Sequence, residues 1–294
     1  MQTAVTSVSA LVRPGAPAPR SGRVHSTFAT SLNVELDGSL VHLGPDTAPL
    51  SCFGATVQAD EMADLVARSR VGDEARLSHG VLRIYSRARV SELALGAAPV
   101  RDLAVGAAAR VPEGADAALV AVLERMGLIE RIGLPWPDRS RAAVTDLARF
   151  SVACLRAEEG SGDDARYEAA VRAMRGAVDY LLGRGLGLTP SGDDVLTGFG
   201  CGLRFLHGAQ GWADPFFAAV LEALPGRTTA VSEAYLRAMC AGYANEDYLD
   251  LLAAIGAGRF EDLSRLCSRI LSIGHTSGAD TLLGFGASFS CLLS

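Results

Sequence analysis

The alternation of apolar and polar residues changes character once along the chain. Over residues 24–57, short apolar runs alternate with polar positions, and the dipeptide Asp37-Gly38 separates two of them. A period of two residues is typical of β-strands, and Asp-Gly between such runs indicates a hairpin. Residues 61–70 have helical spacing, and residues 75–85 return to strand-like alternation. The pattern predicts a small β-rich, barrel-like domain over residues 23–112.

After residue 112, apolar residues recur at helical spacing almost to the C-terminus. Helices are expected over residues 116–126, 139–157, 164–182, 192–206, 215–224, 228–241, 246–255, 260–271 and 278–293. We therefore predict an α+β protein whose larger domain, residues 113–294, is all-helical and contains a repeated loop–helix motif. Residues 1–22 are rich in Ala, Ser, Pro and Gly and have no periodicity, which predicts a flexible lead-in.

Composition and charge narrow the classes of partner. Hydrophobic residues make up 49% of the 294 positions, enough for a sizeable core. The formal charge is −6 without any block of basic residues, which argues against nucleic acid or an anionic membrane as a partner. The six cysteines have no CxxC spacing, so neither a disulfide framework nor a cysteine zinc site is expected. Because no charge-free stretch of about 18 residues and no secretory signal occurs, a cytoplasmic protein is predicted.

One sequence motif occurs twice in the helical half. Residues 183–202 read GRGLGLTPSGDDVLTGFGCG, and residues 273–286 read IGHTSGADTLLGFG. The second copy repeats a serine, a glycine and an acid of the first, so that Ser277, Gly278 and Asp280 fall on Ser191, Gly192 and Asp194. Two copies of one loop and helix start suggest a shared site.

Small residues within these two helices indicate how they pack. Gly198 and Gly202 of the first copy are matched by Gly284 and Ser288 of the second. Glycine inside a helix costs about 1 kcal/mol relative to alanine, and a close crossing of the two helices would explain that cost. We expect a local pseudo-two-fold that brings the polar residues of both helix starts to one pocket, namely Ser191, Asp193, Asp194, Ser277 and Asp280.

The loop before the first helix has two interpretations. Simple helix capping explains Ser191 and one acid, because a hydroxyl accepts a free N–H and an acid offsets the positive helix end. However, Gly185 and Gly187 let the backbone approach a ligand closely, and the N–H groups of a helix start favour a small anion. The segment is not a Walker loop, since no lysine follows the last glycine, nor a Rossmann fingerprint, since a helix precedes it.

The two copies differ where a reaction would need unequal groups. Thr189 is replaced by His275, and Asp193 by Ala279. The catalytic candidates are therefore His275, Asp193 and Asp194, with a capping or core histidine as an equal alternative for His275. The substrate-binding candidates supply hydroxyls, glycine backbone, a carboxylate and one guanidinium, and they are Gly187, Thr189, Ser191, Gly192, Arg227, Thr228, Ser277, Gly278 and Asp280. For Arg227, an exposed arginine beside a threonine cap is an equal alternative.

The residues predict no cofactor and no metal ligand set, with Mg²⁺ as the alternative. Asp193 and Asp194 could bind Mg²⁺, but adjacent acids on a helix point in different directions. His25 and Ser26 could form a base and nucleophile pair. That pair is discounted, because neighbours in a regular strand face opposite sides of the sheet.

Four blocks of the sequence resemble a known family. They read GRVHSTFATSLNVELDGSLVHL, GRGLGLTPSGDDVLTGF, GRTTAVSEAYLRAMCAGY and SIGHTSGADTLLGF, and they span about residues 23–290. In this order and spacing they resemble the AllH-type family. The resemblance implies a subunit of oxamate carbamoyltransferase that works with other subunits in allantoin catabolism. It also implies transfer of a carbamoyl group between oxalurate and phosphate, giving oxamate and carbamoyl phosphate.

Three functions therefore stand as hypotheses. The first is a carbamoyltransferase-type enzyme or catalytic subunit, in which residues 187–194, Arg227 and Thr228 hold a small anionic substrate and His275 or an aspartate moves the proton. The second is a non-catalytic subunit that binds a metabolite or shapes a complex. The third is a biosynthetic enzyme of secondary metabolism on the same scaffold. Partner subunits are expected, and an apolar helical surface is consistent with a homo-oligomer.

Overall fold

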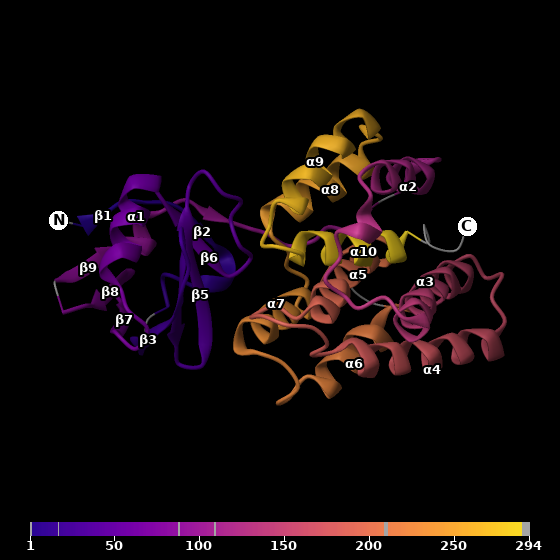
Figure 1. Ribbon diagram of the computed structural model, residues 1–294, viewed down its shortest axis with the longest axis horizontal. Coiled ribbons are helices and arrows are strands. Elements are labelled where there is room, and N and C mark those ends of the chain that lie inside the picture. The colour runs from indigo at the N-terminus through magenta and orange to yellow at the C-terminus, as the bar shows by residue number, and fades with distance from the viewer. Residues whose placement is uncertain (1, 17, 88, 109, 209–210, 290–294) are drawn as a thin grey trace. The chain divides into compact units, whose positions relative to one another are not determined.

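A computed structural model describes residues 2–16, 18–87, 89–108, 110–208 and 211–289. The chain forms two compact units, residues 1–103 and residues 104–294. The first unit is a sheet with one α-helix, and the second is helical (Figure 1). The predicted α+β fold class is therefore confirmed. The change from one unit to the other falls at residue 103, whereas the sequence pattern predicted it at residue 112.

The first unit is a single curved, half-barrel sheet. Its strands follow the order β1-β9-β8-β7-β3-β4-β5-β6-β2-β10. Apolar side chains on one face of the sheet share a core with Met62 and Leu65 of helix α1 (Ala59–Arg68). The strands are β1 (Gln2–Thr3), β2 (Val5–Ser9), β3 (Arg20–Thr27), β4 (Leu32–Leu36), β5 (Ser39–Pro45), β6 (Gly54–Val57), β7 (Glu74–Ser78), β8 (Val81–Tyr85), β9 (Val90–Leu93) and β10 (Val100–Arg101).

The start of the chain differs from the predicted flexible lead-in. Strand β2 lies between β6 and β10, and Val5, Val8 and Val12 are buried in the core of the sheet. Ser9 Oγ donates a 2.5 Å hydrogen bond to the carbonyl oxygen of Cys52. The prediction failed because it relied on the composition of residues 1–22. Small and polar residues surround these three valines, so their spacing was not recognised as that of a strand.

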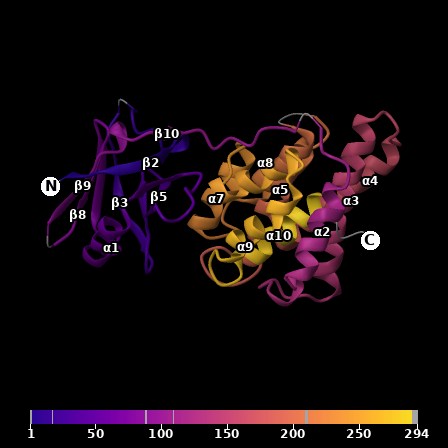
Figure 2. The same ribbon diagram turned by 90° about the horizontal axis from the view of Figure 1, so that it is seen from above.

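The second unit consists of nine helices within the described residues, together with short 3₁₀ turns. Figures 1 and 2 show α5 and α10 side by side, with the other helices around them. The predicted last helix extended to residue 293, of which residues 290–293 lie outside the described residues. The helices are α2 (Ala115–Arg125), α3 (Asp138–Glu158), α4 (Asp164–Leu181), α5 (Ser191–His207), α6 (Asp214–Ala223), α7 (Ala230–Cys240), α8 (Glu246–Gly256), α9 (Leu263–Leu271) and α10 (Ser277–Ser288).

The apolar stripes of these helices meet in one core that includes Phe150, Phe199, Phe216 and Phe285, all with no exposed surface. Nearly all of α5 and α10 is buried, including Ser191, Asp193 and Asp280 of their first turns, and Asp194 and Ser277 are half-buried. Within the described ranges, no helix combines the length and the hydropathy needed to span a bilayer.

Candidate functional site

The two repeated helices cross with their backbones in contact. A Cβ atom added at Gly198 of α5 would lie 2.0 Å from the carbonyl oxygen of Thr281 on α10. Conversely, a Cβ at Gly284 of α10 would lie 2.1 Å from the carbonyl oxygen of Val195 on α5. Only glycine fits at both positions, because real Cβ atoms do not approach other atoms this closely. The close crossing predicted from the small residues is confirmed.

The structural repeat is longer than the sequence repeat. The first turn of each helix packs on the end of the helix before it, so that a Cβ at Gly192 would lie 2.1 Å from the carbonyl oxygen of Leu181. At the equivalent Gly278 the corresponding distance is 1.9 Å, to the carbonyl oxygen of Ile270. Both glycines are therefore packing residues. The repeat unit is a helix, a loop and a second helix, α4–α5 in one copy and α9–α10 in the other.

Hydroxyl groups connect the two helix starts. Thr189 Oγ1, in the loop before α5, lies 2.9 Å from Ser277 Oγ at the start of α10. Ser277 also hydrogen-bonds the carboxyl group of Asp194. In the opposite direction, Ser191 of the first copy hydrogen-bonds Asp280 of the second. Each serine thus serves the acid of the other copy, as a local pseudo-two-fold requires.

Asp280 is the better satisfied of these two acids. Its carboxylate accepts hydrogen bonds from the backbone N–H groups of Gly133, at 3.1 Å from each oxygen, and of Leu134, at 3.0 Å. Burial raises the pKa of Asp280, whereas these backbone donors and the hydroxyls of Ser191 and Thr276 lower it. The sequence analysis did not identify Gly133 and Leu134, because only the close approach of their loop to α10 reveals the role of their N–H groups.

Asp194 has the same place in the first copy but lacks backbone donors to its side chain. Its Oδ2 atom is buried and has no hydrogen-bond partner among the described residues. Burial raises the pKa of Asp194 well above its usual range, against the hydrogen bonds from Ser277 and Thr189. The negative charge of Asp280 raises that pKa further. Two equivalent carboxyls in unequal surroundings allow one to hold a proton while the other provides a fixed acceptor.

Asp193 has a different environment from its neighbour Asp194. Its Oδ1 accepts a 2.6 Å hydrogen bond from the N–H of Gly183, and its Oδ2 accepts hydrogen bonds from the hydroxyls of Thr228 and, at 2.6 Å, Ser232. Burial raises the pKa of Asp193, and these donors lower it. Asp193 therefore joins the loop to the start of α7. The two adjacent carboxyls have separate partners, which is not the convergent arrangement that a shared Mg²⁺ would need.

Arg227 is engaged outside the loop that it was predicted to serve. Its guanidinium donates 2.9 Å hydrogen bonds to both the side-chain oxygen and the carbonyl oxygen of Asp179. The glycine-rich loop itself is exposed, and Leu186, beside Gly187, is 93% exposed. The neighbouring Leu188 carbonyl accepts a hydrogen bond from Thr229, which holds the loop to α7.

His275 is exposed and lines a cavity of about 370 Å³ next to the second copy. The equivalent position of the first copy, Thr189, instead bonds across to Ser277. The cavity is lined by Glu130, Arg131, Ile132, His275, Thr276 and Ala279, among others. Among the described residues, no three His, Cys, Asp or Glu side chains gather as a metal-binding group.

In the first unit, the discounted pair is in contact. His25 Nδ1 lies 3.2 Å from Ser26 Oγ, because a β-bulge between Val24 and Ser26 breaks the regular alternation of strand β3. The prediction that the two side chains face opposite sides was wrong. Asn33 Nδ2 donates to Ser26 Oγ at 3.0 Å, and His42 Nδ1 lies 2.9 Å from Asn33 Oδ1.

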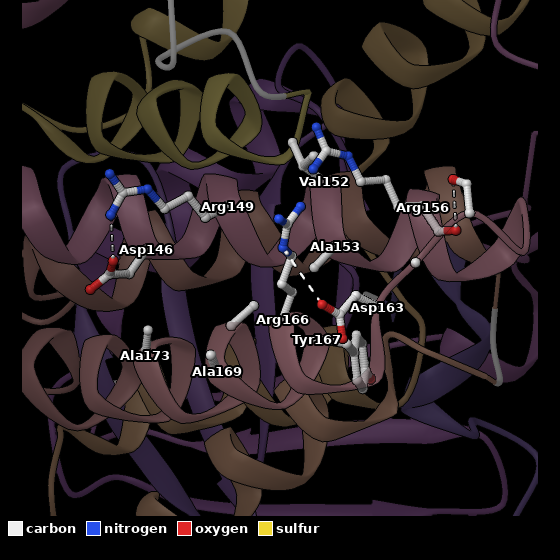
Figure 3. A pocket seen from close by; sticks show the side chains of 13 residues that line it. Asp146, Arg149, Val152, Ala153, Arg156, Asp163, Arg166, Tyr167, Ala169 and Ala173 are labelled. Atoms are coloured by element: carbon white, nitrogen blue, oxygen red, sulfur yellow. Dashed lines mark hydrogen bonds and ion pairs between the residues drawn. The ribbon is translucent and has the colours of Figure 1, made fainter.

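A further cavity of about 540 Å³ lies between α3 and α4 (Figure 3). Alanines such as Ala153, Ala169 and Ala173 line it, and exposed arginines stand around it. Two of these arginines pair weakly with nearby acids, Arg149 with Asp146 and Arg166 with Asp163. This cavity contains none of the predicted site residues.

Buried or half-buried hydroxyls and carboxyls therefore gather where the two helix starts meet, and comparison with known proteins identifies the same stretch. Residues 181–289 match the oxamate carbamoyltransferase subunit AllH family. The match begins at the last residue of α4 and includes both copies of the loop and helix. It confirms the AllH resemblance for this segment. No solved structure matches the chain.

Proposed function

We propose that the meeting point of the two helix starts is the substrate site of a carbamoyltransferase-related protein of allantoin nitrogen catabolism. The observation on which the proposal rests is the carboxyl group of Asp194, which has one buried oxygen without a partner and lies among the hydroxyls of Thr189 and Ser277. The AllH match supports this class of reaction. Oxamate and oxalurate both have amide N–H groups, which suit an unoccupied carboxyl oxygen.

In this proposal Asp194, with one buried oxygen that lacks a partner and a pKa raised by burial, transfers the proton of the reaction. In the cleavage of oxalurate, a phosphate oxygen attacks the carbamoyl carbon and the bond from that carbon to the amide nitrogen breaks. The departing nitrogen needs a proton, and in this proposal the carboxyl of Asp194, whose pKa is raised by burial, provides it. The products are carbamoyl phosphate and oxamate. In the reverse direction, the carboxylate of Asp194 accepts the proton from the attacking amide.

The neighbouring residues then have distinct roles. Ser191 and Ser277 hold the two acids in place, and Asp280 remains fixed by the N–H groups of Gly133 and Leu134. The carboxylate of Asp193 positions the glycine-rich loop through the three hydrogen bonds that it accepts. Asp193 is therefore a positioning residue in this proposal, and Asp194 is the proton-transfer residue.

The test measures phosphate release from carbamoyl phosphate and oxamate by the purified chain, alone and with its partner subunits. We expect Asp194→Asn to lower kcat at least 100-fold, because removal of a general acid typically costs two to four orders of magnitude. Asp164→Asn, at the exposed start of α4, is the matched control and should leave kcat unchanged. Equal kcat for the wild type and Asp194→Asn would overturn the proposal.

A second candidate is a non-catalytic subunit that binds the metabolite for its partners. The description of the matching family as a subunit favours it. Oxamate binding by the isolated chain, with turnover that needs partner subunits and is unaffected by Asp194→Asn, would support this candidate over the first.

A further inference from the structure

The pseudo-two-fold allows a comparison of equivalent spaces in the two copies. In the first copy, the carboxylate of Asp193 lies between the loop and the start of α7 and accepts three hydrogen bonds. In the second copy, Ala279 takes the place of Asp193. Its methyl group cannot accept a hydrogen bond or fill the same volume. The cavity of about 370 Å³ lies at this position, with Ala279 in its wall.

Polar donors surround the space that lacks the carboxylate. The cavity is lined by Arg131 and His275, which provide a guanidinium and an imidazole, and by Thr276, whose hydroxyl already hydrogen-bonds the carboxylate of Asp280. Arg131 forms no ion pair within the part of the chain that the structure describes. A guanidinium without an ion-pair partner beside an imidazole is a good set of donors for carboxylate or phosphate oxygens.

One acid also lines the cavity and must be considered. Glu130 is exposed, and its Oε2 is directed toward Gly127, since a Cβ atom at Gly127 would lie 3.1 Å from it. The Glu130 carboxylate therefore turns back over its own 3₁₀ turn. Arg131 remains available to a ligand.

We infer that this cavity is an anion subsite in which the carboxylate or phosphate group of a ligand replaces the carboxylate that Ala279 lacks. The ligand class is a small anion with a terminal carboxylate or phosphate group. The inference rests on the proposed function in one respect, which is the choice of oxamate and phosphate as the anions to test. It assigns to His275 a role in anion binding, in place of the proton transfer considered from sequence.

The test is isothermal titration of the full chain with inorganic phosphate and, separately, with oxamate. Ala279→Asp restores the internal carboxylate, so we expect it to weaken binding of the anion at least 10-fold. Ala279→Ser is the matched control, because it adds a small polar group without charge, and it should bind within about twofold of the wild type. Thermal unfolding of both variants checks that they are folded.

A second variant keeps the test independent of that buried position. Arg131→Gln should weaken anion binding about 10-fold, whereas Arg141→Gln, an exposed arginine of α3, should not. Binding that is absent in the wild type, or unchanged in both Ala279→Asp and Arg131→Gln, would overturn the inference. Anion binding with no effect of Asp194→Asn on turnover would instead contradict the proposed function and leave the subsite standing.

Discussion

Thr189 Oγ1 and Ser277 Oγ lie 2.9 Å apart, although 87 residues separate them in the chain. This contact joins the loop of the first copy directly to the helix start of the second. It also keeps both hydroxyls beside the carboxyl of Asp194. The two loops are therefore one structural unit at the candidate site.

A double-mutant cycle measures this contact. Thr189→Val and Ser277→Ala should show a coupling of about 0.5–1.5 kcal/mol in the free energy of unfolding, the usual net value of a hydrogen bond. Urea unfolding of the wild type, both single variants and the double variant gives the coupling. Ser277→Ala combined with Ser161→Ala, an exposed serine, should be additive. A coupling near zero for Thr189 and Ser277 would contradict the contact.

The helix crossing predicts that replacing glycine by alanine lowers the stability of the protein at the crossing and raises it at an exposed helix position. Gly198→Ala and Gly284→Ala should each destabilise the protein by about 1–3 kcal/mol, because the new methyl group meets a backbone oxygen of the other helix. Gly176→Ala in α4 is the matched control, since its Cβ would meet nothing within 4 Å, and it should stabilise by up to about 1 kcal/mol. Thermal or urea unfolding measures the change in stability of each variant. A stabilising effect of Gly198→Ala would be incompatible with the crossing.

The surroundings of Asp194 predict a dependence of stability on pH. Its folded pKa is raised well above 3.8, so the folded state keeps a proton that the unfolded state loses. The contribution of this group to stability is present below about pH 4 and is lost as pH rises toward the folded pKa. Asparagine does not titrate. The free energy of unfolding of Asp194→Asn, measured relative to wild type at a series of pH values from 4 to 8, should therefore increase with pH; a constant difference would refute the raised pKa.

Asp193 should matter mainly for folding. Asp193→Ala leaves the donors of Gly183, Thr228 and Ser232 without their acceptor, and a cost of about 2–4 kcal/mol in the free energy of unfolding is expected. Asp179→Ala provides the contrast. It removes an exposed pair with Arg227 and should cost no more than about 1 kcal/mol. Equal losses in the two variants would show that Asp193 is not the buried acceptor described here.

Much of the helical half could be predicted from sequence, because its apolar periodicity and the repeated Ser-Gly-x-Asp pattern depend on local spacing. Gly198 and Gly284 even indicated the crossing, since glycine within a helix has a cost that packing must explain. The N–H groups of Gly133 and Leu134 could not be found in this way. Backbone donors carry no residue-specific signal, and their acceptor, Asp280, lies far along the chain.

The errors in the first unit have local causes. A β-bulge at Val24 and Ser26 shifts the side-chain alternation by one position, so His25 and Ser26 meet on one side. Such a bulge leaves little trace in a single sequence. In the second unit, the residue type of Arg227 predicted contact with a small anion, and the pair that it forms with Asp179 of α4 could not be read from the sequence.

The backbone contact at Gly198 and Gly284 has a consequence for how the two copies can change. In a homodimer of this loop and helix, symmetry would force every substitution to appear on both sides of the crossing. Within one chain, each side is encoded separately. The crossing preserves the shared frame, while one position can keep an aspartate, Asp193, and its counterpart can become Ala279. Because one chain contains both copies, a symmetric scaffold can hold an asymmetric site.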